Sequence, residues 1–459
     1  MILEKVKGKV KQISNKMNID VQTSWDMFFF ENFLLRLSNS NYSKQFIFKG
    51  GFLLQNIIGV SQRTTMDLDF KMIGRNLEDN EIYEIFNSMC IERDNLKYKI
   101  IEINDIKAET KYGGKTVKIE GTFYNIKKTF GIDLGVGDVV TPYPKLYSYK
   151  NLIIDEPFEI LAYPIETIIA EKFETLISKG TNNSRSKDLY DLYILNKHGY
   201  DSELLNAALV NTFISRGTTF NKQYVEEEMN QILCFNWIKD LYNNYSNKHK
   251  FASEVTFDDC VSAIRNIFKD IEFIEPIKLS DYKIELDVIR HGEDESGYTG
   301  GWSNLALTEK GKLDVLNLSK TLDKDYDLFI SSDLLRAKQT AEIINNELQM
   351  NIIYSQDFRE TNNGDFANMS IEEFRKNHLD MVWAKLDMDE CYPNGDSPNS
   401  FFERIKNSLI KLLKQNDGKK ILLVTHGGVV AVLRCLLEGY AYSNKIQKTI
   451  DTASVIKFK

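Results

Sequence analysis

The sequence is poor in cysteine, histidine and proline. Its 459 residues include only five cysteines, five histidines and seven prolines. The cysteines are scattered and odd in number, and no two stand at the spacing of a metal-binding pair, so the sequence predicts reduced thiols and no structural zinc site. No segment holds enough proline, serine or charge of one sign to indicate disorder. The whole chain is therefore expected to fold.

A long apolar run is also missing. The first residues, MILEKVKGKVKQISNKMNID, mix charged side chains with single apolar ones. They contain neither the apolar core of a signal peptide nor the roughly 20 apolar residues that a membrane span requires. We expect a cytoplasmic protein without a membrane partner.

Positive charge is not in excess, because the formal net charge is −8. Binding to the phosphate backbone of nucleic acids is driven by clustered lysine and arginine, so broad non-specific adhesion is excluded, whereas a local basic groove stays open. A chain of this length exceeds the size of one hydrophobic core. Two or three domains are expected.

The pattern of the chain predicts an α/β fold in two domains, residues 1–277 and 278–459. Helical apolar spacing at the N-terminus is followed by FIFKGGFLLQNII, a short strand with a glycine turn and a helix, and then by strand-like segments that form a mixed sheet to about residue 160. Helical spacing dominates the rest of this domain. In the second domain, strands and helices alternate, which is typical of crossover units on a largely parallel sheet.

Two of the five histidines stand in similar positions in the second domain. His291 and His426 each follow an apolar strand and precede a glycine, in LDVIRHG and LLVTHGG. Because the carboxyl ends of parallel strands line one edge of a sheet, both imidazoles are expected in one crevice. Arg290 and Arg336 add guanidinium groups that match phosphate oxygens. A neutral imidazole can attack phosphorus, and Glu360 is a candidate general acid for the leaving oxygen.

From about residue 282 onward the chain resembles the histidine phosphatases, the phosphoglycerate-mutase-like proteins. The resemblance is carried, in the family's order, by Arg290-His291-Gly292-Glu293, LTEKG, SSDLLRAKQTAE, FRETNNGDF and VTHGG. It implies a three-layer α/β/α domain without a metal or other cofactor. It also implies His291 as the phosphorylated nucleophile, Glu360 as proton donor, and a phosphate pocket of Arg290, Arg336 and His426.

One feature departs from that family's pattern. Small polar residues and an asparagine commonly follow the RHG motif, whereas Glu293, Asp294 and Glu295 follow it here. Carboxylates at the mouth of the site would repel a highly anionic substrate. Hydrolysis of a phosphorylated substrate is therefore favoured over a mutase reaction on a bisphosphate.

Acidic residues and a glycine turn form a second constellation, in the first domain. Asp67 and Asp69 are two apart in a strand-like segment, so their side chains emerge on one face, where paired carboxylates can bind a divalent cation. Asp133, in FGIDLGVGD, is the candidate third carboxylate. Lys49, Gly50 and Gly51 precede a helix, whose N-terminal amides suit a phosphate. The alternative is a pair of solvated acids on the outer face of a strand.

The phrase FKGGFLLQNIIGVSQRTTMDLDF resembles the AbiEii/AbiGii-type nucleotidyltransferases, a branch of the polymerase-β-like superfamily found among bacterial toxins and phage-defence proteins. The resemblance covers roughly residues 20–230, and IETIIAEKFETL and RSKDLYDLYIL resemble that family's helical half. It implies that Lys172 and Asp188 are functional. It also implies an NTP substrate bound with Mg²⁺ or Mn²⁺ on the three aspartates.

The sequence thus predicts a bifunctional enzyme, a nucleotidyltransferase fused to a histidine phosphatase. By resemblance, the acceptor of the nucleotide is tRNA or another macromolecule, and the role is that of a toxin–antitoxin or phage-defence protein. Two alternatives stay open: a small-molecule nucleotidyltransferase and phosphatase of a biosynthetic pathway, or a chain in which one domain is inactive and regulatory. The sequence does not indicate the oligomeric state, or whether the phosphatase opposes or serves the transferase.

Overall fold

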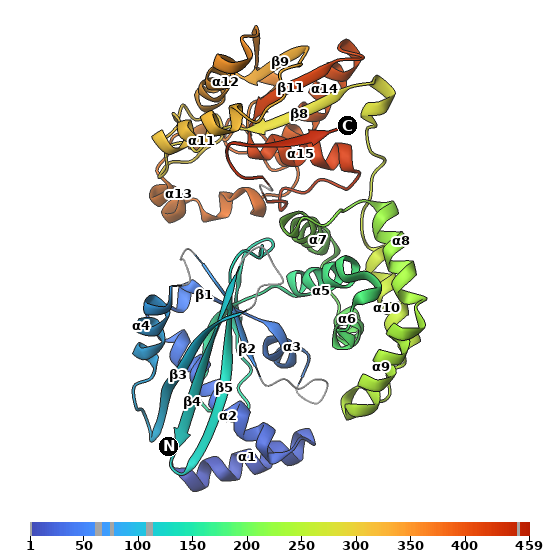
Figure 1. Cartoon of the computed structure of the whole chain (residues 1–459). Helices are drawn as coiled ribbons and strands as arrows, with labels where there is room; N and C mark the ends of the chain where they lie inside the picture. Colours follow the sequence, from blue (N-terminus) through green and yellow to red (C-terminus); the bar gives the residue numbers. More distant parts are fainter. Residues whose placement is uncertain (1, 60–66, 74–77, 107–112, 448–449) are drawn as a thin grey trace. The chain divides into compact units, whose positions relative to one another are not determined.

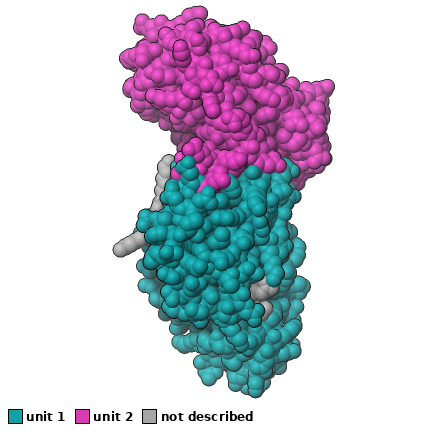
Figure 2. Space-filling model, turned by 90° about the vertical axis from the view of Figure 1, so that its right-hand side faces the viewer, with its two compact units in different colours: residues 1–218, 227–271 teal, residues 219–226, 272–459 magenta. Residues whose placement is uncertain are grey.

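The computed structural model describes residues 2–59, 67–73, 78–106, 113–447 and 450–459. The chain divides into two compact units, which Figure 2 colours separately: residues 1–218 with 227–271, and residues 219–226 with 272–459. Each unit contains a β-sheet and helices, so the α/β class predicted from the sequence is confirmed. Within the described ranges, no helix is both long enough and apolar enough to cross a bilayer.

The first unit contains a mixed sheet of seven described strands in the order β3-β4-β5-β2-β1-β7-β6. Figure 1 labels β1 to β5 of this sheet. At its centre, β2 runs antiparallel to β1 and parallel to β5, and β1 runs parallel to β7. The described strands are β1 (Phe46–Lys49), β2 (Leu68–Met72), β3 (Leu96–Ile106), β4 (Gly114–Phe123), β5 (Ile126–Gly135), β6 (Lys145–Ser148) and β7 (Glu159–Ala162).

Helices precede, interrupt and follow this sheet. The expected helical start, the helix after the glycine turn and the helical half after residue 160 are all present. The bounds are α1 (Leu3–Met17), α2 (Val21–Ser38), α3 (Gly50–Ile58), α4 (Asp79–Met89), α5 (Ile165–Lys179), α6 (Ser186–His198), α7 (Ser202–Arg216), α8 (Lys222–Leu233), α9 (Asn236–Lys248) and α10 (Phe257–Lys269).

Helix α2 is buried on nearly all sides because its middle, FFFENFLL, is apolar around most of the circumference. Phe30 packs against Phe52 of α3 and Phe130 of β5, with ring centroids 5.1 and 5.0 Å apart. Phe33 meets Tyr98 of β3 edge to face. The helix therefore fixes the elements that carry the glycine turn and Asp133.

The second unit is built on a five-stranded sheet of described strands in the order β10-β9-β11-β8-β12. The first four are parallel and β12 is antiparallel to β8, which confirms the predicted crossover pattern. The elements are β8 (Glu285–Arg290), α11 (Glu309–Ser319), β9 (Leu328–Ser332), α12 (Leu335–Leu348), β10 (Ile352–Ser355), α13 (Ile371–Asn377), α14 (Pro398–Gln415), β11 (Lys420–Thr425), α15 (Gly427–Glu438) and β12 (Ser454–Phe458).

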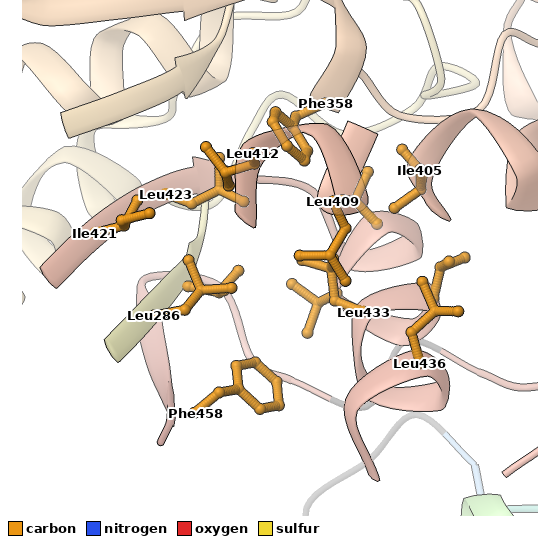
Figure 3. Packing of buried hydrophobic residues seen from close by; sticks show 14 of the residues in the cluster. Leu286, Phe358, Ile405, Leu409, Leu412, Ile421, Leu423, Leu433, Leu436 and Phe458 are labelled. Atoms are coloured by element: carbon orange, nitrogen blue, oxygen red, sulfur yellow. The ribbon is translucent and has the colours of Figure 1, made fainter. Parts of the chain in front are cut away.

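Both faces of this sheet are covered, because alternate residues of the central strand β11 enter different cores. Leu423 packs with Leu409 of α14 and Leu433 of α15, as Figure 3 shows from close by. Leu422 and Val424 belong to the opposite core, together with α11 and α12. A strand with no polar alternation is typical of a sheet buried on both faces. The predicted three-layer α/β/α architecture is confirmed.

Truncation of one fully buried side chain tests this core. In Leu409→Ala, lost apolar contacts and the remaining cavity should lower the free energy of unfolding of the second unit by about 2–5 kcal/mol. The measurement is a urea titration followed by the fluorescence of Trp302 and Trp383, the two tryptophans of this unit. The control variant Leu313→Ala truncates a leucine that is 57% exposed. It should change the free energy of unfolding by at most about 0.5 kcal/mol. Equal losses in both variants would contradict the packing described.

Candidate active sites in the two units

The two histidines of the second unit lie at one edge of the sheet. Strands β8 and β11 are paired in register up to Arg290 and Thr425, and a histidine follows each of these residues. The rings of His291 and His426 are 5.1 Å apart between centroids, and 4% and 0% of the two residues are exposed. The expected convergence of the imidazoles at the strand ends is confirmed.

The hydrogen bonds of His291 fix which ring nitrogen carries the proton. Its Nδ1 lies 2.7 Å from the carbonyl oxygen of Gly292, which can only accept. The guanidinium Nε of Arg336, which can only donate, lies 3.2 Å from Nε2 of the histidine. Both contacts require a neutral ring with its proton on Nδ1. The lone pair of Nε2 then faces the arginine, as a nucleophile in an anion site requires.

Arg336 is the central cation of this site. It begins the first turn of α12, just after β9, and only 2% of it is exposed. Its Nη2 donates to the carbonyl oxygen of Gly301 at 2.8 Å, and its Nη1 lies 3.2 Å from both oxygens of Ser303. Burial lowers the pKa of the guanidinium, while Asp294 and Glu360 oppose that shift. A poorly hydrated guanidinium held in one orientation suits bidentate binding of phosphate.

Arg290, the second predicted arginine, lies at the end of β8. Its Nη1 donates to the carbonyl oxygen of Ile450 at 2.7 Å. Burial lowers its pKa also, and the negative charge of Glu360 opposes this shift most strongly. The predicted residues of the phosphate pocket and the predicted acid thus share one electrostatic environment.

Glu360 lies in the loop that follows β10, and its carboxylate is held against the first turn of α15. Its Oε2 accepts the backbone N–H of Gly428 at 3.1 Å, and its Oε1 accepts its neighbour's N–H, that of Thr361, at 3.2 Å. A Cβ on Gly428 would overlap this carboxylate, so the glycine is required for the close approach. Gly428 comes two residues after His426, and this places a carboxyl group beside the histidine pair.

Two carboxylates of the acidic run after the RHG motif have different partners. Glu293 turns to Lys310, whose Nζ lies 2.6 Å from its carboxylate. Asp294 instead faces the interior, with Oδ2 3.4 Å from Nε of Arg336. Only one of the predicted repelling carboxylates therefore contacts the cations of the site.

Two polar contacts of the site were missed by the sequence analysis. Ser303 binds Arg336, and Ser332 Oγ lies 2.8 Å from Nε2 of His426. Ser332 is the last residue of β9, at the same sheet edge as the histidines. Because carboxyl ends of parallel strands line one edge, the segment DLFISS could have indicated this serine as a site residue. Ser303 lies in a loop, and nothing in its spacing indicates the contact.

In the first unit, three predicted residues are neighbours across the central strands. Asp69 of β2 is paired with Lys49 of β1 and with Asp133 of β5. The Gly51 N–H donates to the Asp69 carboxylate, and Thr116 Oγ1 donates to Asp133 at 2.6 Å. Burial raises the pKa of Asp69, as do the nearby negative charges of Asp133 and Asp67, while Lys49 lowers it. The acids thus gather where a cation would stabilise them.

The glycine turn is shaped around Asp69. Gly50 has φ +74°, a conformation that favours glycine, and a Cβ there would overlap the Asp69 carboxylate. Gly51 follows in the first turn of α3, where backbone amides are not used within the helix. The glycine turn predicted to bind phosphate and Asp69, a predicted metal ligand, are therefore in contact.

The ammonium group of Lys49 lies in a network of charges that the sequence analysis missed. Its Nζ is 2.8 Å from Asp138 and 3.3 Å from Glu171, and Arg216 is 3.1 Å from Asp138. Burial opposes ionisation of Asp138, but Lys49 and Arg216 outweigh it and hold its pKa below the usual range. The network joins the glycine turn to α5 and α7. In the sequence, Glu171 directly precedes the predicted Lys172. This position was the one indication that Glu171 belongs to the site.

The predicted pair in the helical half is in contact. Lys172 Nζ of α5 lies 2.7 Å from Asp188 and 2.7 Å from Asp191, both on α6 and both buried. Asp191 was not predicted, although its place three residues after Asp188 puts both on one helix face. The lysine is therefore held by two carboxylates.

The fit of a divalent cation rests on Asp67, which is exposed, and on Asp69, which is half-buried. Among the described residues, no three side chains of histidine, cysteine, aspartate or glutamate converge as a ready-made metal site. Mg²⁺ is commonly held by one or two carboxylates together with substrate phosphates and water, so the two aspartates fit that mode of binding.

Comparison with known proteins assigns both parts of the chain. A family model described as the nucleotidyl transferase AbiEii toxin of a type IV TA system matches residues 32–263, slightly more than half of the chain. The chain belongs to the AbiEii family. A second model, of the histidine phosphatase superfamily (branch 1), matches residues 286–459. The sequence-based assignment of an AbiEii-type domain fused to a histidine phosphatase domain is confirmed.

Individual relatives match the phosphatase part. A Bacillus subtilis protein named uncharacterized phosphatase PhoE is 30% identical over 156 residues, which are 33% of this chain and 76% of the relative. The adenosylcobalamin/alpha-ribazole phosphatase of Escherichia coli is 27% identical over 163 residues, covering 34% and 80%. The solved alpha-ribazole phosphatase of Shigella flexneri is 24% identical, covering 38% and 89%, with a TM-score of 0.34.

A pair of glycines at the two ends of α3 tests the turn of the AbiEii domain. Gly50→Ala should lower pyrophosphate release from NTP at least tenfold, because the new methyl group displaces the Asp69 carboxylate. Gly59→Ala is the matched control, since Gly59 also has a positive φ, of +105°, but a Cβ there meets nothing within 4 Å. Alanine at a positive φ strains the backbone in both variants, but only Gly50→Ala displaces the Asp69 carboxylate. Similar activities in the two variants would contradict this role of the turn.

Proposed function

We propose that the chain is a bifunctional enzyme. The AbiEii domain transfers a nucleoside monophosphate from an NTP to tRNA or another macromolecule, and the histidine phosphatase domain hydrolyses a phosphomonoester through phospho-His291. The observation that carries the second half is the fixed tautomer of His291, with Nε2 facing the buried guanidinium of Arg336. The contact of the glycine turn with Asp69 supports the first half.

In the phosphatase reaction, Nε2 of His291 attacks phosphorus and the bond to the ester oxygen breaks. Arg290, Arg336 and His426 stabilise the charge on the other phosphate oxygens. Glu360 gives its proton to the leaving alcohol oxygen, and as a carboxylate it then takes a proton from the water that attacks phosphohistidine. Inorganic phosphate leaves, and His291 is neutral again. Asp294 and Ser303 position Arg336 throughout.

In the transferase reaction, the acceptor hydroxyl attacks the α-phosphorus of the NTP and pyrophosphate leaves. Asp67 and Asp69, with Asp133 on the neighbouring strand, would hold Mg²⁺ or Mn²⁺, which neutralises charge on the triphosphate. The Lys49-Gly50-Gly51 turn would bind the phosphates of the NTP. Lys172 is positioned by Asp188 and Asp191 for the same anionic substrate. The biological role that fits this chemistry is growth control or defence against phage.

The loss of activity on replacing the proposed general acid should depend on the leaving group of the substrate. Glu360→Gln should lower kcat/KM for an alkyl phosphate by roughly 10²–10⁴-fold, the usual contribution of a general acid. For p-nitrophenyl phosphate the loss should be much smaller, since p-nitrophenolate leaves without a proton. The control Glu372→Gln, on the exposed surface of α13, should change neither value. An equal loss on both substrates would assign Glu360 to binding instead.

The acceptor of the nucleotide can be identified by mass. The His291→Ala chain, in which the phosphatase is disabled, is incubated with each NTP, Mg²⁺ and either total tRNA or a metabolite extract. We expect intact-mass spectrometry to show tRNA heavier by one nucleoside monophosphate. The Asp67→Ala/Asp69→Ala chain should leave tRNA unchanged. A labelled metabolite together with unmodified tRNA would show the small-molecule enzyme instead.

A further inference from the structure

A cavity of about 320 Å³ lies in the second unit beside Glu360. Seven of its 17 lining residues are aromatic, among them Phe366, Phe374, Trp383 and Tyr392. These four come from the loops and short helices between β10 and α14, the segment that also carries Glu360. The lining therefore suits an apolar guest.

Charged groups are nearly missing from the part of this lining that the structure describes. There, Glu360 is the only carboxylic acid, and no lysine, arginine or histidine is present. Polar side chains already have partners in the protein: Thr299 Oγ1 donates to the carbonyl oxygen of Phe366, and Asn363 Oδ1 accepts the Trp302 N–H at 3.2 Å. Burial raises the pKa of Tyr392 and Tyr442, so both phenols stay neutral. An anionic guest would lose its hydration without a compensating cation.

The cavity adjoins residues that contact the phosphate pocket. Glu360 and Gly428 line it, and the N–H of Gly428, two residues after His426, donates to the Glu360 carboxylate. Gly301 lines it as well, and its carbonyl oxygen accepts from Nη2 of Arg336 at 2.8 Å. A phosphate on Arg336 would therefore direct its ester substituent past Glu360, the proposed acid for the ester oxygen, and into the aromatic lining.

The volume is enough for a ring with a short linker. An apolar cavity of roughly 150 Å³ holds a benzene molecule, and this one is about twice as large. Aromatic linings of this kind favour offset or edge-to-face contacts with a bound ring.

We propose that the phosphatase site selects phosphomonoesters of uncharged alcohols that carry an aromatic ring or an apolar group of similar size, seated in this cavity. The proposal rests on the phosphatase function proposed above. It excludes phosphoglycerates as preferred substrates, because their carboxylate would enter a lining whose described residues include no cation.

The test compares alkyl phosphates, whose leaving oxygens have similar reactivity. We expect kcat/KM for 3-phenylpropyl phosphate to exceed that for 3-phosphoglycerate by on the order of 100-fold, the effect of burying a ring. Glycerol 1-phosphate, whose alcohol part is uncharged but has no ring, should fall between them. Equal or higher kcat/KM for 3-phosphoglycerate would overturn the substrate class alone. Failure to hydrolyse any of these esters and also p-nitrophenyl phosphate would overturn the phosphatase function together with it.

Variants of the lining connect the preference to the cavity. Phe374→Ala removes one wall and Ile371→Trp fills the space, and each should reduce the ratio of kcat/KM between phenylpropyl and glycerol phosphate at least fivefold. Hydrolysis of glycerol phosphate shows whether each variant is folded. Because one variant enlarges the cavity and the other fills it, the test still works if one of them does not fold. Leu379→Ala, at a leucine that is 54% exposed and outside the lining, should keep the wild-type ratio. An unchanged ratio in both lining variants would overturn the proposal.

Discussion

Burial of positive charge is the constraint on which both sites depend. A cation removed from water needs partners that replace its hydration, or its charged form is strongly destabilised. In the second unit, Arg336 is 2% exposed and is held by carbonyl oxygens, by a serine and by Asp294. These partners leave its Nε directed at His291. The same contacts that make burial of the arginine tolerable therefore orient the nucleophile.

The first unit meets this constraint with carboxylates instead of carbonyl groups. Lys49, Arg216 and Lys172 each contact two or more acids. Removing one partner of such a group leaves a buried charge without compensation and is more destabilising than loss of a surface ion pair. The turn at Gly50 and helix α5 are thus fixed relative to each other by charge. Precise placement of the acids then needs no disulfide, and all five cysteines are free.

The sequence was sufficient wherever a repeating backbone rule determines position. Strand ends of a parallel sheet must meet at one edge, so the convergence of His291 and His426 followed from two short motifs. Pairing of Asp69 with Asp133 follows similarly from neighbouring strands. The rule fails for side chains whose partner is distant in sequence and lies on an irregular segment. Ser303 and the wall of the aromatic cavity lie on loops, where neither a period of 2 nor one of 3.6 applies.

The chemistry of the two domains limits how one can act on the other's product. A nucleoside monophosphate joined to a hydroxyl group forms a phosphodiester, with one negative charge and organic groups on two of its oxygens. In the proposed phosphatase reaction, the site around His291 instead offers cations to a dianion, and the organic group of the phosphate enters the aromatic cavity. Direct removal of the nucleotide would require a second substituent to pass the buried guanidinium of Arg336. The geometry thus favours a phosphatase that acts on a separate monoester over one that reverses the transfer.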